Sequence, residues 1–197
     1  MFQDKIFLAS QSPRRRELVS YLFDNVAILS VSYSEPESKG FAPLDYLDLC
    51  VGEKWKQALP VWKAPNNSGL LVADTMVAFQ GALLGKPSGP KEAEQMLSSL
   101  SGKWHTVFTG FKLVRVADSV MNEGDVVIVD TAVKFKKLKA AEIRAYVKSG
   151  EPLDKAGAYG FQDRGLRFVS SVRGAYTNIV GLPLEKIRAE CQRLGFR

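Results

Sequence analysis

Asp74 is the side chain whose surroundings in the sequence point most directly to chemistry. It stands inside the apolar run of residues 70–79, which has the composition of a buried β-strand. An ionised carboxylate in such a place is costly unless it is paired or bound to a metal ion. Asp74 is therefore either a strand-end acceptor of backbone hydrogen bonds or a functional group, as a metal ligand or as a base that orients a water molecule.

A second set of candidate residues lies near the N-terminus, where the apolar run 6–9 is followed by Ser12 and Pro13. Serine caps helices and proline suits the first helical position, so a helix should begin at Pro13 with three arginines, residues 14–16, in its first turn. The helix dipole already makes that end positive, and an anion would relieve the added charge. The arginines can be solvated surface residues. Together with the serines and the preceding strand, they favour a polyphosphate site built from backbone N–H groups, hydroxyls and guanidinium forks.

Composition limits the kind of protein. The chain has 197 residues, a net charge of +6, 46% hydrophobic and 24% charged residues, which is ordinary for one globular domain. The positive charge suits an anionic ligand but does not distinguish a nucleotide from nucleic acid or a membrane surface. No apolar run is long enough to span a membrane, and the two cysteines, Cys50 and Cys191, form no disulfide framework, which predicts a cytoplasmic protein. With His105 as the one histidine, a metal ion would need carboxylates, which favour Mg²⁺ or Mn²⁺.

The hydrophobic patterns predict an α/β fold with a mixed, twisted sheet, in one domain over residues 1–197. A helix from Pro43 should end at Pro60, with Leu44 and Leu47 on its apolar stripe. A long strand over residues 104–116 should be bulged at Gly110, because glycine inside a strand often marks a bulge. Further strands are expected at residues 26–31, 82–84, 126–135 and 168–172, further helices at 90–102, 139–149 and 183–194, and a glycine-rich loop at 151–165.

Several short motifs also resemble those of one family. The sequence Leu-Ala-Ser-Gln-Ser-Pro-Arg-Arg at residues 8–15 looks like the N-terminal signature of the Maf family of nucleoside triphosphate pyrophosphatases. The resemblance continues through Ala73-Asp74-Thr75 and Gly85-Lys86-Pro87 to Leu184, nearly the whole chain. The run 149–162, which ends Ala-Gly-Ala-Tyr-Gly-Phe-Gln, resembles the pyrimidine-preferring branch of that family.

The resemblance implies a set of site residues. Asp74 and Glu35 would hold a divalent cation, Mg²⁺ or Mn²⁺, and orient a water molecule. Ser34 stands where the family usually has an acid, and Ala175 where it has a serine. Catalytic roles are thus expected for Asp74, Glu35 and Lys86, and substrate-binding roles for Ser10, Arg14, Arg15, Lys54, Thr75 and Gln162.

The resemblance also implies a fold and an activity. The fold would be inosine triphosphatase-like, an elongated mixed sheet with flanking helices and two lobes around a cleft. The activity would be hydrolysis of dTTP and UTP to the monophosphate and diphosphate, in a protein that forms a homodimer. Within the family, 7-methyl-GTP is the alternative substrate. In another class, the chain would be a non-catalytic module that binds nucleotides, nucleic acid or a cell-division partner, although its arginines cluster at one helix end rather than along a stripe.

Overall fold

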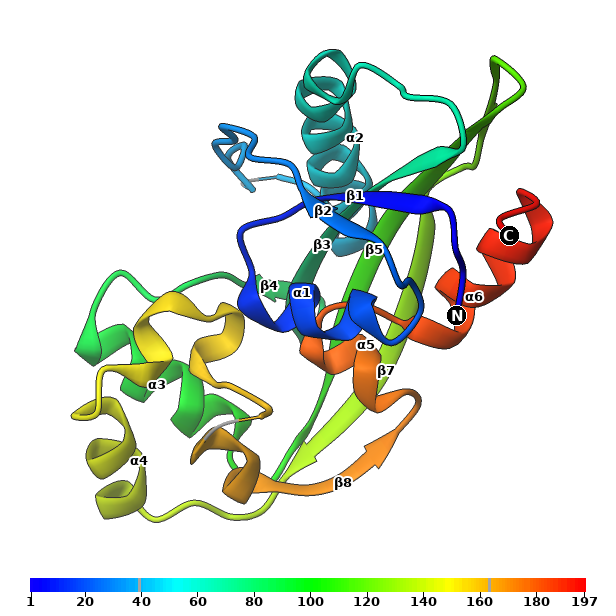
Figure 1. Ribbon diagram of the computed structural model, residues 1–197. Helices are drawn as coiled ribbons and strands as arrows, with labels where there is room; N and C mark the ends of the chain where they lie inside the picture. The colour runs from blue at the N-terminus through cyan, green and yellow to red at the C-terminus, as the bar shows by residue number, and fades with distance from the viewer. Residues whose placement is uncertain (39, 163) are drawn as a thin grey trace.

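The computed structural model describes residues 1–38, 40–162 and 164–197. Its strands form one sheet in the order β2-β1-β3-β5-β7-β8, with β4 paired to β3 and β6 to β5 (Figure 1). The strands are β1 (Lys5–Ala9), β2 (Val26–Ile28), β3 (Ser68–Phe79), β4 (Ala82–Leu84), β5 (Trp104–Ala117), β6 (Val120–Glu123), β7 (Val127–Phe135) and β8 (Val169–Arg173). The α-helices are α1 (Pro13–Ser20), α2 (Pro43–Trp62), α3 (Pro90–Leu100), α4 (Ala140–Val147), α5 (Tyr176–Val180) and α6 (Leu184–Arg193).

The sheet is mixed, as predicted. Strand β1 runs parallel to both β2 and β3, whereas β3, β5, β7 and β8 pair in antiparallel fashion. Strand β3 is buried along nearly its whole length, because α2 covers one face of the sheet and α1, α5 and α6 lie on the other (Figure 1). Among the described residues, no helix combines the length and the hydropathy needed to cross a membrane.

A second group of elements lies beyond the end of the long strands. Helices α3 and α4 pack together there with 3-10 turns at Glu151–Asp154, Ala156–Ala158 and Arg164–Phe168 (Figure 1). The sequence predicted a glycine-rich loop over residues 151–165, and the structure folds most of it into these turns. The molecule therefore has two lobes, as expected.

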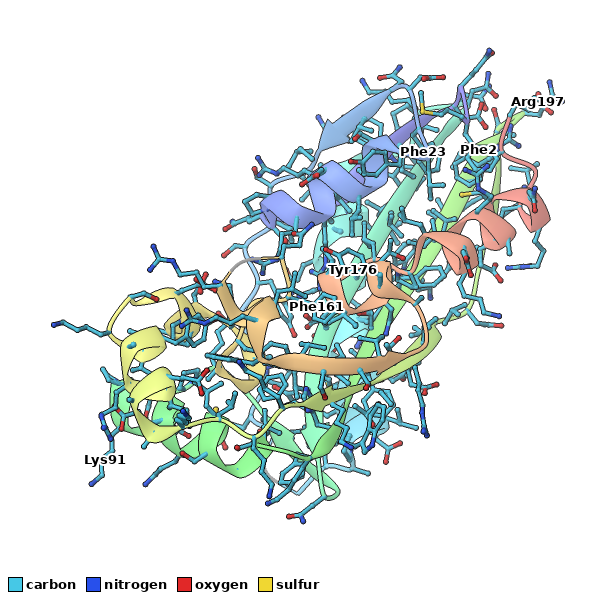
Figure 2. All side chains as sticks on the ribbon, turned by 90° about the horizontal axis from the view of Figure 1, so that it is seen from below. Phe2, Phe23, Lys91, Phe161, Tyr176 and Arg197 are labelled. Carbon is cyan, nitrogen blue, oxygen red and sulfur yellow. The ribbon has the colours of Figure 1, made fainter. Side chains whose placement is uncertain are left out.

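The two ends of the chain meet at the opposite end of the sheet. Phe2 packs against Phe23 with ring centroids 5.3 Å apart, and Figure 2 shows both near Arg197. The backbone N–H of Asp4 donates to the carbonyl of Arg197 at 3.0 Å. This hydrogen bond joins the segment before β1 to the C-terminal residue in the lobe that carries β1 and α1, and so it helps to hold the first helix against the sheet.

Helix α1 begins where the sequence predicts. The Ser12 hydroxyl accepts from the backbone N–H of Arg15 at 3.4 Å, and Pro13 occupies the first turn. Leu18 and Val19 are buried against the sheet. Local capping chemistry thus fixes the helix start, and the arginines at 14–16 lie in its first turn as expected.

Helix α2 begins at Pro43, as predicted, but differs from the prediction in its end and in one residue of its apolar stripe. It continues through Pro60 to Trp62 instead of ending at the proline. Proline removes one backbone hydrogen bond from the last turn, but burial of Trp62, which is 2% exposed and packs edge-on against Phe7, offsets that loss. At the other end, Leu44 is 48% exposed and does not join the buried stripe, because the stripe starts only where the helix meets the sheet.

Gly110 marks no bulge. The pairing of β5 with β3 and with β7 continues in unbroken register through this glycine. A Cβ added there would lie 3.0 Å from Leu47 Cγ and from Val51 Cγ2 of α2. The glycine therefore lets α2 approach the sheet closely, and its role is in packing rather than in strand geometry.

We expect Gly110→Ala to lower the free energy of unfolding by about 1–3 kcal/mol, since the added methyl overpacks the helix–sheet contact. The matched control is Gly52→Ala on α2, where an added Cβ meets nothing within 4 Å. That change should raise the free energy of unfolding by about 0.5–1 kcal/mol, because alanine is the better helix former. Urea unfolding of both variants measures this, and equal effects in the two variants would contradict the packing role of Gly110.

The remaining elements differ in detail from their prediction. Strand β2 ends at Ile28 rather than at residue 31, and the short strand β6 forms a hairpin with the end of β5 before β7 begins. Helix α5 was not predicted, since five residues give too short a pattern to recognise. Cys50 and Cys191 are both buried, as expected of packing residues.

Candidate active site

The described residues enclose a cavity of about 1280 Å³ between the two lobes, large enough for a nucleotide. One wall comes from the turn between β1 and α1, the N-terminal half of α2 and the second half of β3. The other comes from the loop after β4 and the turns around residues 154–161. Most of the side chains singled out in the sequence line it: Ser10, Arg14, Arg15, Glu35, Lys54, Asp74, Thr75 and Lys86.

Asp74 is at the centre of the charged groups in this cavity. It is 8% exposed, and its Oδ2 lies 2.9 Å from Lys54 Nζ. Its Oδ1 accepts the backbone N–H of Thr75 at 2.9 Å and stands 3.8 Å from Arg15 Nη2. Burial lowers the pKa of the Lys54 ammonium, and the Asp74 carboxylate opposes that shift. Asp74 is thus a fixed, paired carboxylate that lines the cavity.

Arg15 is more deeply engaged with the protein than the sequence suggested. Its Nε donates to the Gly181 carbonyl at 2.9 Å, Nη1 to the Ala73 carbonyl at 3.0 Å and Nη2 to Thr75 Oγ1 at 2.8 Å. Three of its five N–H groups are therefore used inside the protein, and two remain for a ligand. Burial lowers the pKa of the guanidinium, while the carboxylate of Asp74 opposes this.

Gly181 makes the Arg15 contact possible. Its φ of 121° lies in the region that favours glycine, and a Cβ there would be 3.2 Å from Arg15 Nε. The guanidinium consequently ties α1 to β3 and to the turn after α5. Arg15 has a structural role in addition to any contact with substrate.

Glu35 and Lys86 form a second, more open pair in the same cavity. Glu35 Oε1 lies 3.7 Å from Lys86 Nζ, and both side chains are more than half exposed. A pair of this kind contributes little to stability and can rearrange around a ligand. The structure thus brings the two predicted carboxylates, Asp74 and Glu35, to one cavity in different settings.

Ser10 and Arg14 lie at the start of α1. The Ser10 Oγ accepts the backbone N–H of Ser12 at 3.2 Å, which shapes the turn into the helix. Arg14 lines the cavity and is partly exposed. It is the arginine of the first turn that is better placed to meet a ligand, because Arg15 is largely occupied.

Gln162 does not line the cavity. The residues before it do so, namely Tyr159, Gly160 and Phe161. Phe161 packs against Tyr176 with ring centroids 5.1 Å apart (Figure 2). Ala175, which stands where a serine was expected, also lies outside the lining and donates its backbone N–H to Thr131 Oγ1. A role for Gln162 in substrate binding stays a prediction.

Tyr33 and Lys155 line the cavity but were not assigned to the site from the sequence. Lys54 Nζ lies 4.7 Å from the centre of the Tyr33 ring, a cation–π contact that covers the ion pair with Asp74. Lys155 has a side chain only 10% exposed and donates to the Glu151 carbonyl at 2.9 Å. An aromatic residue close before Glu35 in a polar loop was the available signal for Tyr33, whereas Lys155 resembled an ordinary exposed partner of Asp154.

The described part of the chain has no cluster of three or more His, Cys, Asp or Glu side chains that would hold a metal ion unaided. Four carboxylates of the described residues line the cavity, those of Glu35, Glu37, Asp74 and Asp154; of these, Asp74 and Glu35 are paired with Lys54 and Lys86. Mg²⁺ commonly uses one or two carboxylates and takes its other ligands from phosphates and water. The donor set therefore fits an ion that binds together with a phosphorylated substrate.

His105 is structural, as expected from the sequence. It is 3% exposed, and its Nε2 is 2.7 Å from the hydroxyl of Tyr159. Burial lowers its pKa from 6.5 to about 4. The neutral ring packs edge-on against Phe135, and His105 is not among the described residues that line the cavity.

The lowered pKa of His105 predicts that the free energy of unfolding decreases as the pH is lowered. The unfolded chain binds the imidazole proton near pH 6.5, whereas the folded chain binds it only near pH 4. The contribution of the neutral His105 to the free energy of unfolding is therefore complete above pH 6.5. It is lost as the pH falls toward 4, and the loss is about 2 kcal/mol between pH 7 and pH 5. Urea unfolding at both pH values measures it. His105→Gln should reduce the pH dependence by that amount, and an unchanged dependence would contradict it.

Comparisons with known proteins agree with this geometry. A family model described as "Maf-like protein" matches residues 5–194. A dTTP/UTP pyrophosphatase of Pelotomaculum thermopropionicum is 38% identical over 192 residues, which cover 98% of this chain and 97% of that protein. Proteins of the same name from Anaeromyxobacter dehalogenans and Methanosarcina barkeri are 43% and 40% identical, over 98% and 97% of this chain and 95% and 94% of theirs.

Proposed function

Because the chain belongs to the family of Maf-like proteins, we propose that it is a nucleoside triphosphate pyrophosphatase that hydrolyses dTTP and UTP. The products would be the nucleoside monophosphate and inorganic diphosphate. The observation that carries this proposal is the buried Asp74 carboxylate, held by Lys54 and close to Arg15, inside a cavity large enough for a nucleotide.

The charges of the cavity suit a triphosphate. Arg14 and Lys86 are the more accessible cations, and Lys155 lies in the same wall as Lys86, opposite Arg14. The planar guanidinium of arginine and the ammonium of lysine both bind phosphate oxygens through charge-assisted hydrogen bonds. These residues would hold the chain of phosphates along the cavity and offset the negative charge that grows on the leaving diphosphate.

Asp74 and Glu35 would hold a divalent cation, Mg²⁺ or Mn²⁺, together with the phosphates. Such an ion supplies Lewis-acid stabilisation of phosphate charge and lowers the pKa of bound water. Within the protein, Asp74 would accept the proton of the attacking water through a carboxylate oxygen. Lys54 and the Thr75 N–H fix the carboxylate for that task, at 2.9 Å each.

The preference for pyrimidines rests on the relatives' names and on the glycine-rich run before Gln162. Gly157 in that run has a positive φ and packs close to Val77 of the cavity lining, where a Cβ would contact the Val77 side chain at 3.1 Å. We further propose that the protein acts in the cytoplasm, where its free buried cysteines suit a reducing compartment, and that it forms a homodimer, which light scattering would test.

Product analysis tests the proposed reaction. Phosphorus NMR of dTTP incubated with the protein and Mg²⁺ should show dTMP and diphosphate appearing in equal amounts. Formation of dTDP and inorganic phosphate would place cleavage at the other anhydride and contradict the proposal. A nucleotide that binds without any product would favour the non-catalytic alternative.

A further inference from the structure

Beneath Asp74, two threonine hydroxyls on neighbouring strands touch inside the protein. Thr75 on β3 pairs in register with Thr109 on β5, and their Oγ1 atoms are 2.9 Å apart. Thr75 lines the cavity, whereas Thr109 is fully buried. A buried hydroxyl at such a place needs partners, and its partners determine which way each proton points.

The backbone carbonyl of Asn178 determines the direction of these hydrogen bonds. Thr109 Oγ1 lies 2.8 Å from the backbone carbonyl of Asn178 on α5, and a carbonyl can only accept, so Thr109 must donate to it. Thr109 has one proton, and its oxygen can then only accept from Thr75. The proton of Thr75 therefore points to Thr109 and away from the cavity.

Arg15 completes the chain. Its Nη2 donates to Thr75 Oγ1 at 2.8 Å, so one lone pair of that oxygen is occupied and its proton is already committed. Thr75 has only an acceptor left to offer a ligand. The same contact holds the guanidinium of Arg15 beside Asp74, with Nη2 at 3.8 Å from Oδ1.

We propose that Thr109 is a positioning residue for the active site. It commits the proton of Thr75 and anchors the Thr75 oxygen, which accepts from Arg15, to the Asn178 carbonyl, and so it helps to hold the guanidinium next to Asp74. It follows that Thr75 Oγ1 can meet a hydrogen-bond donor of the nucleotide, such as a sugar hydroxyl or a base N–H, or a metal cation, but not a phosphate oxygen. The catalytic part of this inference rests on the proposed function, while the ordering of Arg15 does not.

Two measurements test the ordering of Arg15 and the effect on catalysis separately. The first is hydrogen exchange of the Arg15 Nε–H by NMR, assigned by its loss in Arg15→Lys, because this group donates to the Gly181 carbonyl and needs no substrate to be observed. The second is the separate measurement of kcat and KM for dTTP. Thr109→Val removes both hydrogen bonds of the hydroxyl at nearly constant volume, Thr109→Ser keeps them, and Thr109→Ala serves if the valine variant does not fold.

Thr131→Val is the matched control. Thr131 is also a fully buried threonine, and its Oγ1 bonds Asn178 Nδ2 at 3.0 Å and the Ala175 N–H at 3.2 Å. Within the described part of the chain it makes no direct hydrogen bond to Thr75, Thr109 or Arg15, and it meets the side-chain amide of Asn178 whereas Thr109 meets the Asn178 backbone carbonyl. Its replacement should lower thermal stability as Thr109→Val does, without affecting Arg15 or turnover.

In Thr109→Val we expect Arg15 exchange to accelerate about tenfold and kcat to fall about tenfold, the effect of one lost hydrogen bond, with a smaller change in KM. Thr109→Ser should restore both to within about twofold of the original protein, in keeping with the serine hydroxyl making the same two bonds. Unchanged exchange in Thr109→Val, or equal acceleration in Thr131→Val, would overturn the proposal. If the original protein turned over no nucleotide, the proposed function would fail, and the exchange measurement would still decide the role of Thr109.

Discussion

Replacing Asp74 with asparagine should lower kcat for dTTP and UTP by at least about a hundredfold, or about 3 kcal/mol in transition-state stabilisation. The amide has nearly the same shape but carries no charge, so it can neither accept the proton of water nor bind a divalent cation well. The Oδ1 contact with the Thr75 N–H survives, whereas the ion pair with Lys54 at 2.9 Å is lost. Steady-state release of diphosphate measures the effect.

The Asp74→Asn protein should remain folded, because its strand is paired on both sides and its neighbours are buried. Circular dichroism and urea unfolding check this. Asp48→Asn, an exposed carboxylate on α2 outside the cavity lining, is the matched control and should keep full activity. Substantial turnover by folded Asp74→Asn would remove Asp74 from the mechanism.

Lys54→Met should give the second large effect, with kcat/KM reduced about a hundredfold. It removes the ammonium that fixes Asp74 Oδ2 and leaves a nearly buried carboxylate whose remaining cationic neighbour among the described residues is Arg15, at 3.8 Å. Removal of one partner of such a pair is strongly unfavourable, and we expect the free energy of unfolding to fall by about 2 kcal/mol. Kinetics with dTTP and urea unfolding of the same preparation give both quantities.

Lys56→Met is the control for Lys54→Met. Lys56 stands two residues further along α2, is 71% exposed and pairs with Glu53 on the surface, so its loss should change stability by less than about 1 kcal/mol. The double variant Asp74→Asn/Lys54→Met should recover stability without recovering activity, since it buries no unpaired charge. Equal stability losses in Lys54→Met and Lys56→Met would show that the Asp74 pair contributes nothing.

Local chemistry explains what the sequence predicted well. Ser12 and Pro13 define the start of α1 through capping, so the first-turn arginines could be placed from the residue pattern alone. The hairpin of β3 and β4 follows from an apolar run, a Gln-Gly turn and a short return strand. The carboxylate of Asp74 was recognised because its burial has to be compensated.

Non-local contacts explain what the sequence could not predict. Arg15 is bound by Gly181, which lies 166 residues away, and nothing near Arg15 in the chain indicates this partner. Gly110 resembled a bulge because its true neighbours, Leu47 and Val51, come from a helix that crosses above the strand. The extension of α2 past Pro60 likewise depends on the packing of Trp62 against Phe7 of β1.

The most direct test of the central claim is kcat/KM for diphosphate release from dTTP, UTP, CTP, GTP, ATP and 7-methyl-GTP with Mg²⁺ or Mn²⁺. We predict that dTTP and UTP are the preferred substrates, by about tenfold or more, as expected of base contacts that cost about 1.4 kcal/mol to lose. Turnover of 7-methyl-GTP alone would keep the reaction and contradict the pyrimidine preference. No turnover of any nucleotide by folded protein would contradict the assignment of the cavity as an active site.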